Sequence, residues 1–146
     1  MTENNLTSQV IDNVYKNAHI ALQSISNVLP EAEDGALKRE LHAQYEGYEK
    51  FIGELSKFMH DNGFEPKDVN PLKKAMLFTS VKMNALTDDS ASHLADMMVK
   101  GTVMGITELR QLLSRSGDNL DGAVKEQVKK LLDLEESYEK KLKAYL

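Results

Sequence analysis

The sequence SASHLADMMVKGTVMGITELRQLLSR, residues 90–115, decides the fold of this chain. Its Met residues recur at helical spacing, and Met is an adaptable filler of helical cores. Gly101 and Gly105 lie one turn apart. Each Gly costs about 1 kcal/mol relative to Ala in a helix interior, so a close approach of another helix is expected to compensate. The stretch is therefore predicted to be a buried central helix that the rest of the chain covers.

Two helices are predicted before this stretch. The first, about residues 6–29, carries apolar residues at spacings of three and four, the signature of one buried face. Pro30 ends it. The second, about residues 31–62, ends at Asn62-Gly63, where Gly suits the left-handed residue after a helix. Its apolar stripe has one polar member and consists of Leu37, Leu41, Gln44, Tyr48, Phe51, Leu55 and Phe58.

Two further helices are predicted around the stretch. Asn70-Pro71 is a start signal, a capping side chain before a first-turn Pro, for a short helix over residues 71–86. This helix is apolar on more than one side. The last helix, about residues 119–145, carries in its seam Val124, Val128, Leu131, Glu135, Tyr138, Leu142 and Tyr145.

The lengths of the connections predict the order of the helices. The first and last connections are short, so helices one and two, and the last two, should form antiparallel hairpins. Residues 63–89 are different, because a helix of about 15 residues alone covers about 22 Å. This segment can therefore run the length of a bundle. The prediction is an all-α, four-helix, up-down-down-up bundle with a long crossover that contains the short helix.

Composition limits the class of protein. The chain has 146 residues, enough for one domain spanning residues 1–146 with a real core. Its net charge of −5, with both signs interspersed, argues against nucleic acid as the main partner. The absence of Cys excludes disulfides and thiolate sites. No signal peptide and no apolar run of about 20 residues is present, so a cytoplasmic location without membrane binding is expected.

The chain resembles the ferritin-like superfamily, and more closely a bacterial ferritin-like family of unknown function. The resemblance rests on HDNGFEP at residues 60–66, PLKKA at residues 71–75 and KMNALTDDSASHLADMMVKG at residues 82–101. Metal-binding members of the superfamily use a Glu from each of two helices and Glu-x-x-His from each of the other two. Here Glu135 is followed three residues later by Tyr138, and neither Glu40 nor Glu46 has the partner His. The resemblance implies the fold, while this departure argues against iron oxidation or storage.

Polar residues in the helical seams are the first candidates for a site. Gln44, Glu108 and Glu135 interrupt apolar faces, and a buried carboxylate is costly unless it is paired. In the predicted order, Gln44 and Glu135 lie at the height of His19, with Tyr45 and Lys100 beside them. One interpretation is a polar layer that fixes helix register, as single polar core positions do in coiled coils. The other is a metal site formed by His19, Gln44 and Glu135.

His42 and Glu46 form a second candidate metal pair, because they lie one helical turn apart. Such pairs also arise by chance in a charged helix. The Met residues at positions 76, 83, 97, 98 and 104 have soft thioethers that suit haem or copper(I), but core packing is the favoured interpretation. No cofactor is predicted, and the alternative metal site would hold iron, manganese or zinc.

The sequence favours a non-catalytic protein that acts by self-association or partner binding. The apolar crossover helix invites burial against a second copy, which predicts a homodimer. The alternative is a metal-binding protein or metal-dependent oxidoreductase with a non-standard carboxylate and His site in the core. Residues 70, 71, 101 and 105 (Asn, Pro, Gly and Gly) are assigned structural roles.

Overall fold

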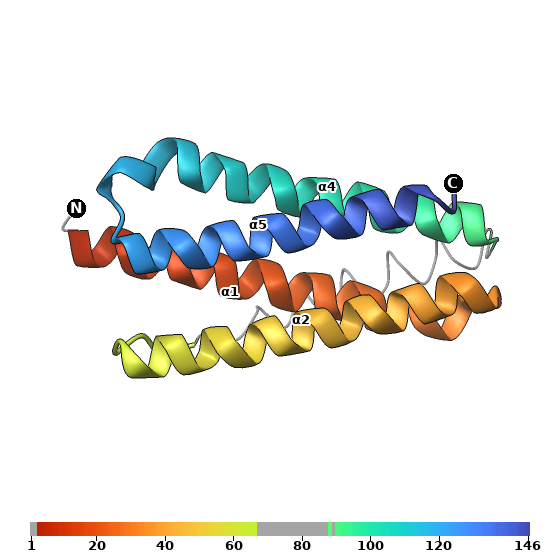
Figure 1. Ribbon diagram of the computed structural model, residues 1–146, viewed down its shortest axis with the longest axis horizontal. Helices are drawn as coiled ribbons and strands as arrows, with labels where there is room; N and C mark the ends of the chain where they lie inside the picture. The colour runs from red at the N-terminus through yellow and green to blue at the C-terminus, as the bar shows by residue number, and fades with distance from the viewer. Residues whose placement is uncertain (1–2, 67–87, 89) are drawn as a thin grey trace.

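Four long helices pack as a bundle in the computed structural model, which describes residues 3–66, 88 and 90–146 (Figure 1). They are α1 (Glu3–Val28), α2 (Gly35–Asp61), α4 (Ala91–Ser116) and α5 (Gly122–Lys143). Short 3-10 turns, η1 (Leu29–Glu31) and η2 (Gly117–Asn119), lie in the two hairpin connections. The predictions of an all-α protein and of a four-helix bundle are confirmed. The short helix predicted over residues 71–86, with Asn70 and Pro71, lies outside the described residues.

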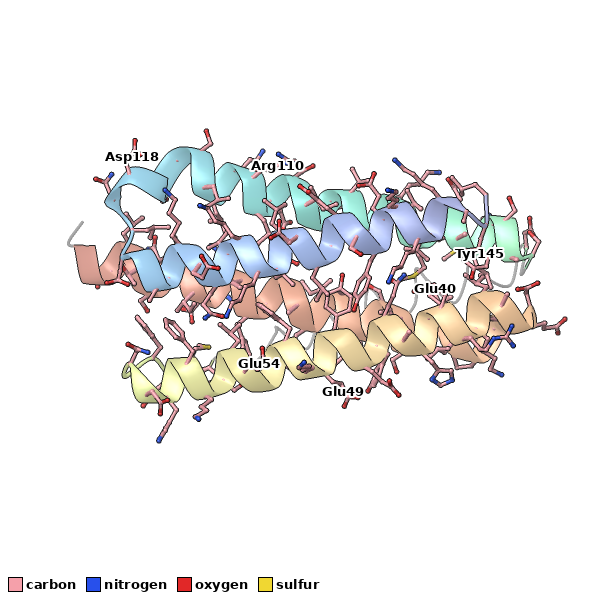
Figure 2. The ribbon with its side chains drawn as sticks, viewed as in Figure 1. Glu40, Glu49, Glu54, Arg110, Asp118 and Tyr145 are labelled. Carbon is pink, nitrogen blue, oxygen red and sulfur yellow. The ribbon has the colours of Figure 1, made fainter. Side chains whose placement is uncertain are left out.

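The helices alternate in direction within each hairpin. In Figure 1, α1 and α5 run from left to right, while α2 and α4 run from right to left. The Tyr145 hydroxyl donates to the carbonyl of Ala36 at 3.3 Å, so the C-terminal end of the chain lies against the start of α2 (Figure 2). The end of α2 and the start of α4 therefore lie at opposite ends of the bundle. None of the helices in the described part of the chain combines the length and apolar character needed to span a membrane.

Side-chain caps determine where three helices begin. Asp34 accepts a hydrogen bond from the backbone N–H of Leu37 at 2.9 Å, and Ser90 caps α4 in the same way. Asp121 caps α5 by accepting from the backbone N–H of Ala123 at 2.7 Å. The second helix was predicted to begin at residue 31, but it begins at Gly35. Residues 29–31 instead form the 3-10 turn η1, and Asp34 supplies the cap that starts α2. At the other end of α2, Gly63 has φ of +75°, the left-handed conformation predicted for it.

The core is one cluster that receives a face from each of the four helices. The predicted stripes of α2 and α5 are confirmed with two changes. Met59 is fully buried and Phe58 only partly, and Tyr145 is only partly buried, beyond the end of α5. The largest fully buried apolar side chains are Ile11, Ile25, Leu37, Leu41, Leu55, Met59, Leu94, Leu109, Leu131 and Leu142.

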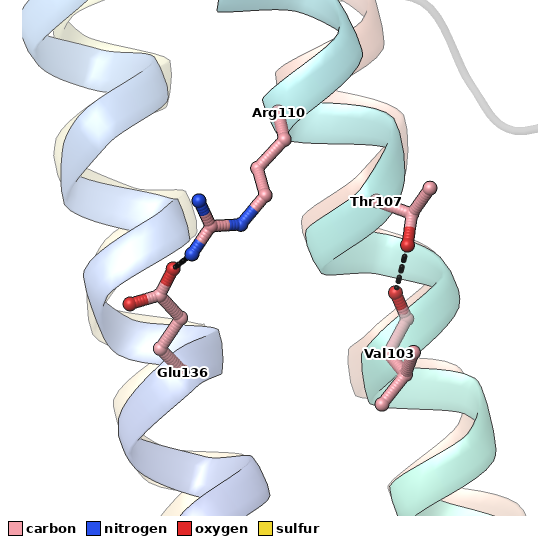
Figure 3. Close-up of polar contacts among 4 residues, drawn as sticks. All are labelled: Val103, Thr107, Arg110 and Glu136. Carbon is pink, nitrogen blue, oxygen red and sulfur yellow. Dashed lines mark hydrogen bonds and ion pairs between the residues drawn. The ribbon is translucent and has the colours of Figure 1, made fainter.

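The prediction that residues 90–115 form a central helix inside a shell of the other three is wrong. Only one face of α4 is buried, and Met104 on its other side is 67% exposed. Core packing is thus correct for Met98 and wrong for Met104. The outer face also carries Thr107, whose hydroxyl donates to the carbonyl of Val103 at 2.8 Å (Figure 3). A helix with one apolar stripe occupies a corner of a bundle, because its polar face needs water.

Ion pairs and exposed charges lie on the outside of the bundle. Arg110 of α4 forms an ion pair with Glu136 of α5, which links the two helices of the second hairpin (Figure 3). Glu49, Glu54 and Asp118 are exposed (Figure 2). Exposed pairs of this kind contribute little to stability, about 0–1 kcal/mol each. The apolar core is therefore the main source of stability.

Gly47 of α2 is in close contact with Tyr138 of α5. A Cβ atom at this position would lie 1.7 Å from the hydroxyl oxygen of Tyr138 and 3.0 Å from its Cζ. The Tyr138 ring also lies edge-on against Tyr48, with 5.2 Å between ring centroids. Gly47 thus gives the Tyr138 ring its place in the core. The sequence analysis missed this contact.

We expect opposite effects from two Gly-to-Ala substitutions in α2. Gly47→Ala should lower the free energy of unfolding by about 1–3 kcal/mol, because the methyl group overlaps Tyr138. Gly53→Ala is the matched control, since no described atom lies within 4 Å of a Cβ there. It should raise stability by about 0.5–1 kcal/mol, because Ala is the better helix former. Chemical denaturation of the two variants measures both values, and equal effects would contradict this packing.

Candidate ligand-binding cavity

A cavity of about 280 Å³ enters the bundle between α1 and α4. Its exposed wall is formed by Gly101, Met104 and Glu108 of α4, and its inner wall by the buried side chains of Tyr48 and Glu135. We call it the Glu135 cavity. All four helices contribute to it, and its lining consists of Asn17, Ile20, Ala21, Ser24, Val28, Gln44, Tyr48, Met97, Met98, Gly101, Thr102, Met104, Gly105, Glu108 and Glu135.

Glu135 is the central polar group of this cavity. It is 1% exposed, and its Oε2 accepts a hydrogen bond from the Tyr48 hydroxyl at 3.1 Å. No donor among the described residues reaches Oε1, which is also buried. A buried acceptor without a donor costs about 1–3 kcal/mol. The carboxyl group is therefore only half satisfied by the described residues.

The environment of Glu135 favours its protonated form. The pKa of Glu135 is raised from 4.5 to about 8, and burial is the largest cause. The charge of Glu108 also raises the pKa, and the hydrogen bond from Tyr48 lowers it. The pKa of Tyr48 is also raised, by burial first and then by the charge of Glu135. At neutral pH the Glu135 carboxyl is mostly neutral. This state explains how an acid occupies the core of the bundle without a described cationic partner.

Asn17 provides a second incompletely bonded group in the cavity wall. Its side chain is 7% exposed, and its Nδ2 donates to the carbonyl of Gly105 at 3.1 Å. Its Oδ1 is buried and has no donor among the described residues. The sequence analysis missed Asn17. The available signal was a polar residue at spacings of three and four among Val10, Val14, Ala21 and Val28.

The structure brings together two of the three residues of the predicted polar layer. Gln44 and Glu135 both line the cavity and are each 1% exposed. Gln44 donates from Nε2 to Glu40 at 3.2 Å. His19 does not line the cavity, and its ring packs against Tyr15 with 4.3 Å between ring centroids. Gln44 and Glu135, which were predicted at the same height, thus share the cavity lining. His19 does not, because it projects from another side of α1.

Glu108 lines the cavity as an exposed residue and not as the buried one that was predicted, and four other candidate residues lie outside the cavity. Lys100 is exposed and pairs with Asp96 at 2.8 Å, and Tyr45 is partly buried on α2. His42 and Glu46 are both exposed on α2. Within the described residues, no group of three or more His, Cys, Asp or Glu side chains is arranged to hold a metal ion.

The two Gly residues of α4 have different surroundings. A Cβ at Gly105 would lie 2.9 Å from Oε1 and 3.0 Å from Oε2 of Glu135, so the predicted close approach is confirmed there. At Gly101 no described atom lies within 4 Å of such a Cβ, so the described residues supply no close packing there. Gly101 instead lines the Glu135 cavity.

Comparison with known protein families, curated proteins and solved structures finds no match for the chain. The cavity therefore has to be interpreted from its own residues.

Substituting each Gly of α4 by Ala should distinguish the two positions. Gly105→Ala should destabilise the protein by about 1–3 kcal/mol, because the methyl group displaces the Glu135 carboxyl from its bond with Tyr48. Gly101→Ala should stabilise it by about 0.5–1 kcal/mol through helix propensity alone. Thermal unfolding measures the difference, and a destabilising Gly101→Ala would show that the position is closely packed after all.

The raised pKa of Glu135 should make stability depend on pH. The folded protein holds this proton up to a pKa of about 8, while the unfolded chain releases it at the usual 4.5. The contribution of this proton to the free energy of unfolding is fully present below the pKa of Glu135 in the unfolded chain. It is lost as pH rises through the pKa of Glu135 in the folded protein. Between these values, stability should fall relative to Glu135→Gln by about 1.4 kcal/mol per pH unit. Denaturation at several pH values tests this, with the exposed Glu126→Gln as the control that should follow the wild type.

Proposed function

We propose that this protein binds a small organic molecule in the Glu135 cavity. The observation that carries the proposal is a cavity that runs from the surface to a buried carboxyl, one of whose oxygens has no partner among the described residues. Ligand sites are typically concave, mostly apolar and furnished with a few polar groups that fix orientation. Protein cores otherwise pack to the density of organic crystals, so an open space of this size needs an explanation.

The size and lining of the cavity support this proposal. An engineered cavity of about 150 Å³ holds benzene in another protein, and this one has about 280 Å³. Most of the lining is apolar and includes three Met side chains, which adapt to the shape of a ligand. The buried polar side chains of Tyr48 and Glu135 lie at the inner end of the cavity. A molecule with an apolar body and one hydrogen-bonding end matches this arrangement.

Binding rather than catalysis is the activity that the lining supports. Among its described lining residues, the titratable side chains are Tyr48, Glu108 and Glu135, and no nucleophile with an adjacent base occurs. Hydrogen bonds from Asn17 and Tyr48 hold the inner wall in place, which suits a preorganised binding site. We therefore propose a binding protein without a reaction step of its own.

We also propose that the fold is ferritin-like. The directions of the four helices, with α1 and α5 parallel to each other and opposed to α2 and α4, support this assignment (Figure 1). The predicted homodimer depends on residues 71–86, outside the described part, and stays a prediction. The predicted metal site of His19, Gln44 and Glu135 also stays a prediction. Metal titration of the wild type and of Glu135→Gln tests it, since equal binding would exclude Glu135 as a ligand.

Ligand binding can be tested with 2-phenylethanol, a neutral molecule with an apolar body and one polar end. We expect it to bind the wild type in the millimolar range or tighter, as reported by NMR chemical shifts of α1 and α4. Gly101→Leu should abolish binding while the protein stays folded, because its side chain enters the cavity from a position without close neighbours. The matched control is Gly53→Leu, at an exposed site on α2 outside the cavity lining. Absence of binding to the wild type would refute the proposal.

A further inference from the structure

The charges on the cavity wall have one sign. Among the lining residues that the structure describes, Glu108 and Glu135 are the only ones that carry a charge when ionised near neutral pH, and both are acidic. They are close enough for the charge of Glu108 to oppose ionisation of Glu135. A cation that enters between them would relieve this repulsion, because an opposite charge stabilises an ionised carboxylate. An anion would be repelled by both.

The unpartnered atoms of the wall are hydrogen-bond acceptors. Oε1 of Glu135 and Oδ1 of Asn17 are buried without a donor among the described residues. Both side chains contact Gly105: Asn17 through its hydrogen bond to the carbonyl, and Glu135 through the space that a Cβ would fill. The terminal torsion of Glu is broad, so a small rotation presents Oε1 to the cavity. The buried wall atoms that lack a partner among the described residues are thus oxygen atoms of the Glu135 carboxylate and the Asn17 amide, and an ammonium group supplies three donors.

The remainder of the wall suits an apolar body. Ile20 and Val28 of α1 face Met97, Met98 and Met104 of α4 across the cavity. Thioethers and branched alkyl groups make favourable contacts with both aryl and alkyl groups. With a polar inner end and an apolar remainder, the cavity distinguishes the two ends of a ligand.

We propose that the ligand is a small primary amine with an apolar body, whose ammonium group binds Glu135 and Asn17 at the inner end of the cavity. This inference rests on the proposed function and specifies the class of its ligand. Carboxylates bind an ammonium group through charge-assisted hydrogen bonds, which are about twice as strong as neutral ones. Binding takes one proton from Glu135, because the ammonium pairs with the carboxylate and not with the acid.

The groups that face Glu135 determine how binding depends on pH. They are Tyr48 of α2, which donates to it, and Glu108 of α4, which repels its charge. The lining residues of α1 include no titratable side chain. A neighbouring hollow of about 180 Å³ shares Asn17 and Glu108 with the cavity and is also lined by Lys16 and Arg115. Affinity for an amine should therefore follow the ionisation of Glu135 and rise toward pH 8.5.

The test compares three molecules of similar size by calorimetry: 2-phenylethylammonium, 2-phenylethanol and phenylacetate. At pH 8.5 we expect the amine to bind at least about tenfold more tightly than the alcohol, and phenylacetate not to bind, since charge-assisted hydrogen bonds are the strong ones. Between pH 8.5 and 6.5 amine affinity should fall about twentyfold, because the Glu135 carboxyl becomes protonated. Alcohol affinity should change little. An alkylammonium group, like Lys with a pKa of about 10.4, stays charged throughout.

Two variants assign the preference to Glu135. Glu135→Gln should bind the amine no more tightly than the alcohol, with no dependence on pH, whereas the exposed Glu126→Gln should match the wild type. If the alcohol binds as well as the amine to the wild type at pH 8.5, the amine assignment is wrong and the cavity function stands. If neither molecule binds, the proposed function itself is wrong. Because the wild-type pH series alone shows the preference, the test does not depend on how well Glu135→Gln folds.

Discussion

The hydrogen bond from Tyr48 to the buried carboxyl of Glu135 is the interaction on which the centre of the bundle depends. It joins α2 to α5 at a level where α4 approaches with Gly105 and α1 contributes Asn17. A carboxyl group in this position is tolerated only when neutral or paired, because an isolated buried charge is very costly. Burial meets this requirement by raising the pKa of Glu135 to about 8. The contacts around this polar group thus involve all four helices.

The same group explains why the core is open beside it. An apolar side chain at Gly105 would displace the carboxyl, so α4 has no Cβ there, and at Gly101 the missing side chain leaves free space. Both Gly residues carry a cost in helix propensity of about 1 kcal/mol each. One cost is offset by contact with Glu135. The cost at Gly101 is balanced by no described contact. The proposed binding role of the cavity explains why a residue without a side chain occupies this position.

Much of this arrangement follows from the spacing of apolar residues. The stripes of α2 and α5 placed Gln44 and Glu135 in the core, because residues three and four apart share a helical face. Counting residues from the ends of the helices placed them at the same height. Connection lengths likewise indicated two hairpins. Residue spacing and connection length are local properties of the chain, so they can be taken directly from the sequence.

Contacts that depend on the rotation of one helix against another could not be predicted from residue spacing and connection length. His19 was predicted at the level of Glu135 but packs on Tyr15, because height does not specify which side of α1 faces the cavity. The contact of Gly47 with Tyr138 has no signal in α2 alone. α4 was expected to be central because its Gly and Met residues were assigned to packing, whereas Gly101 and Met104 face open space or solvent.

The central claim is that Glu135 is a buried, protonated acid at neutral pH, and one titration tests it directly. Carbon-13 NMR of the Glu side-chain carboxyl groups, with Glu135→Gln to assign the resonance, reports its ionisation. A midpoint near pH 8 is the result expected from its burial. A midpoint near the usual 4.5 would show a solvated carboxylate and would contradict both the core and the cavity described above.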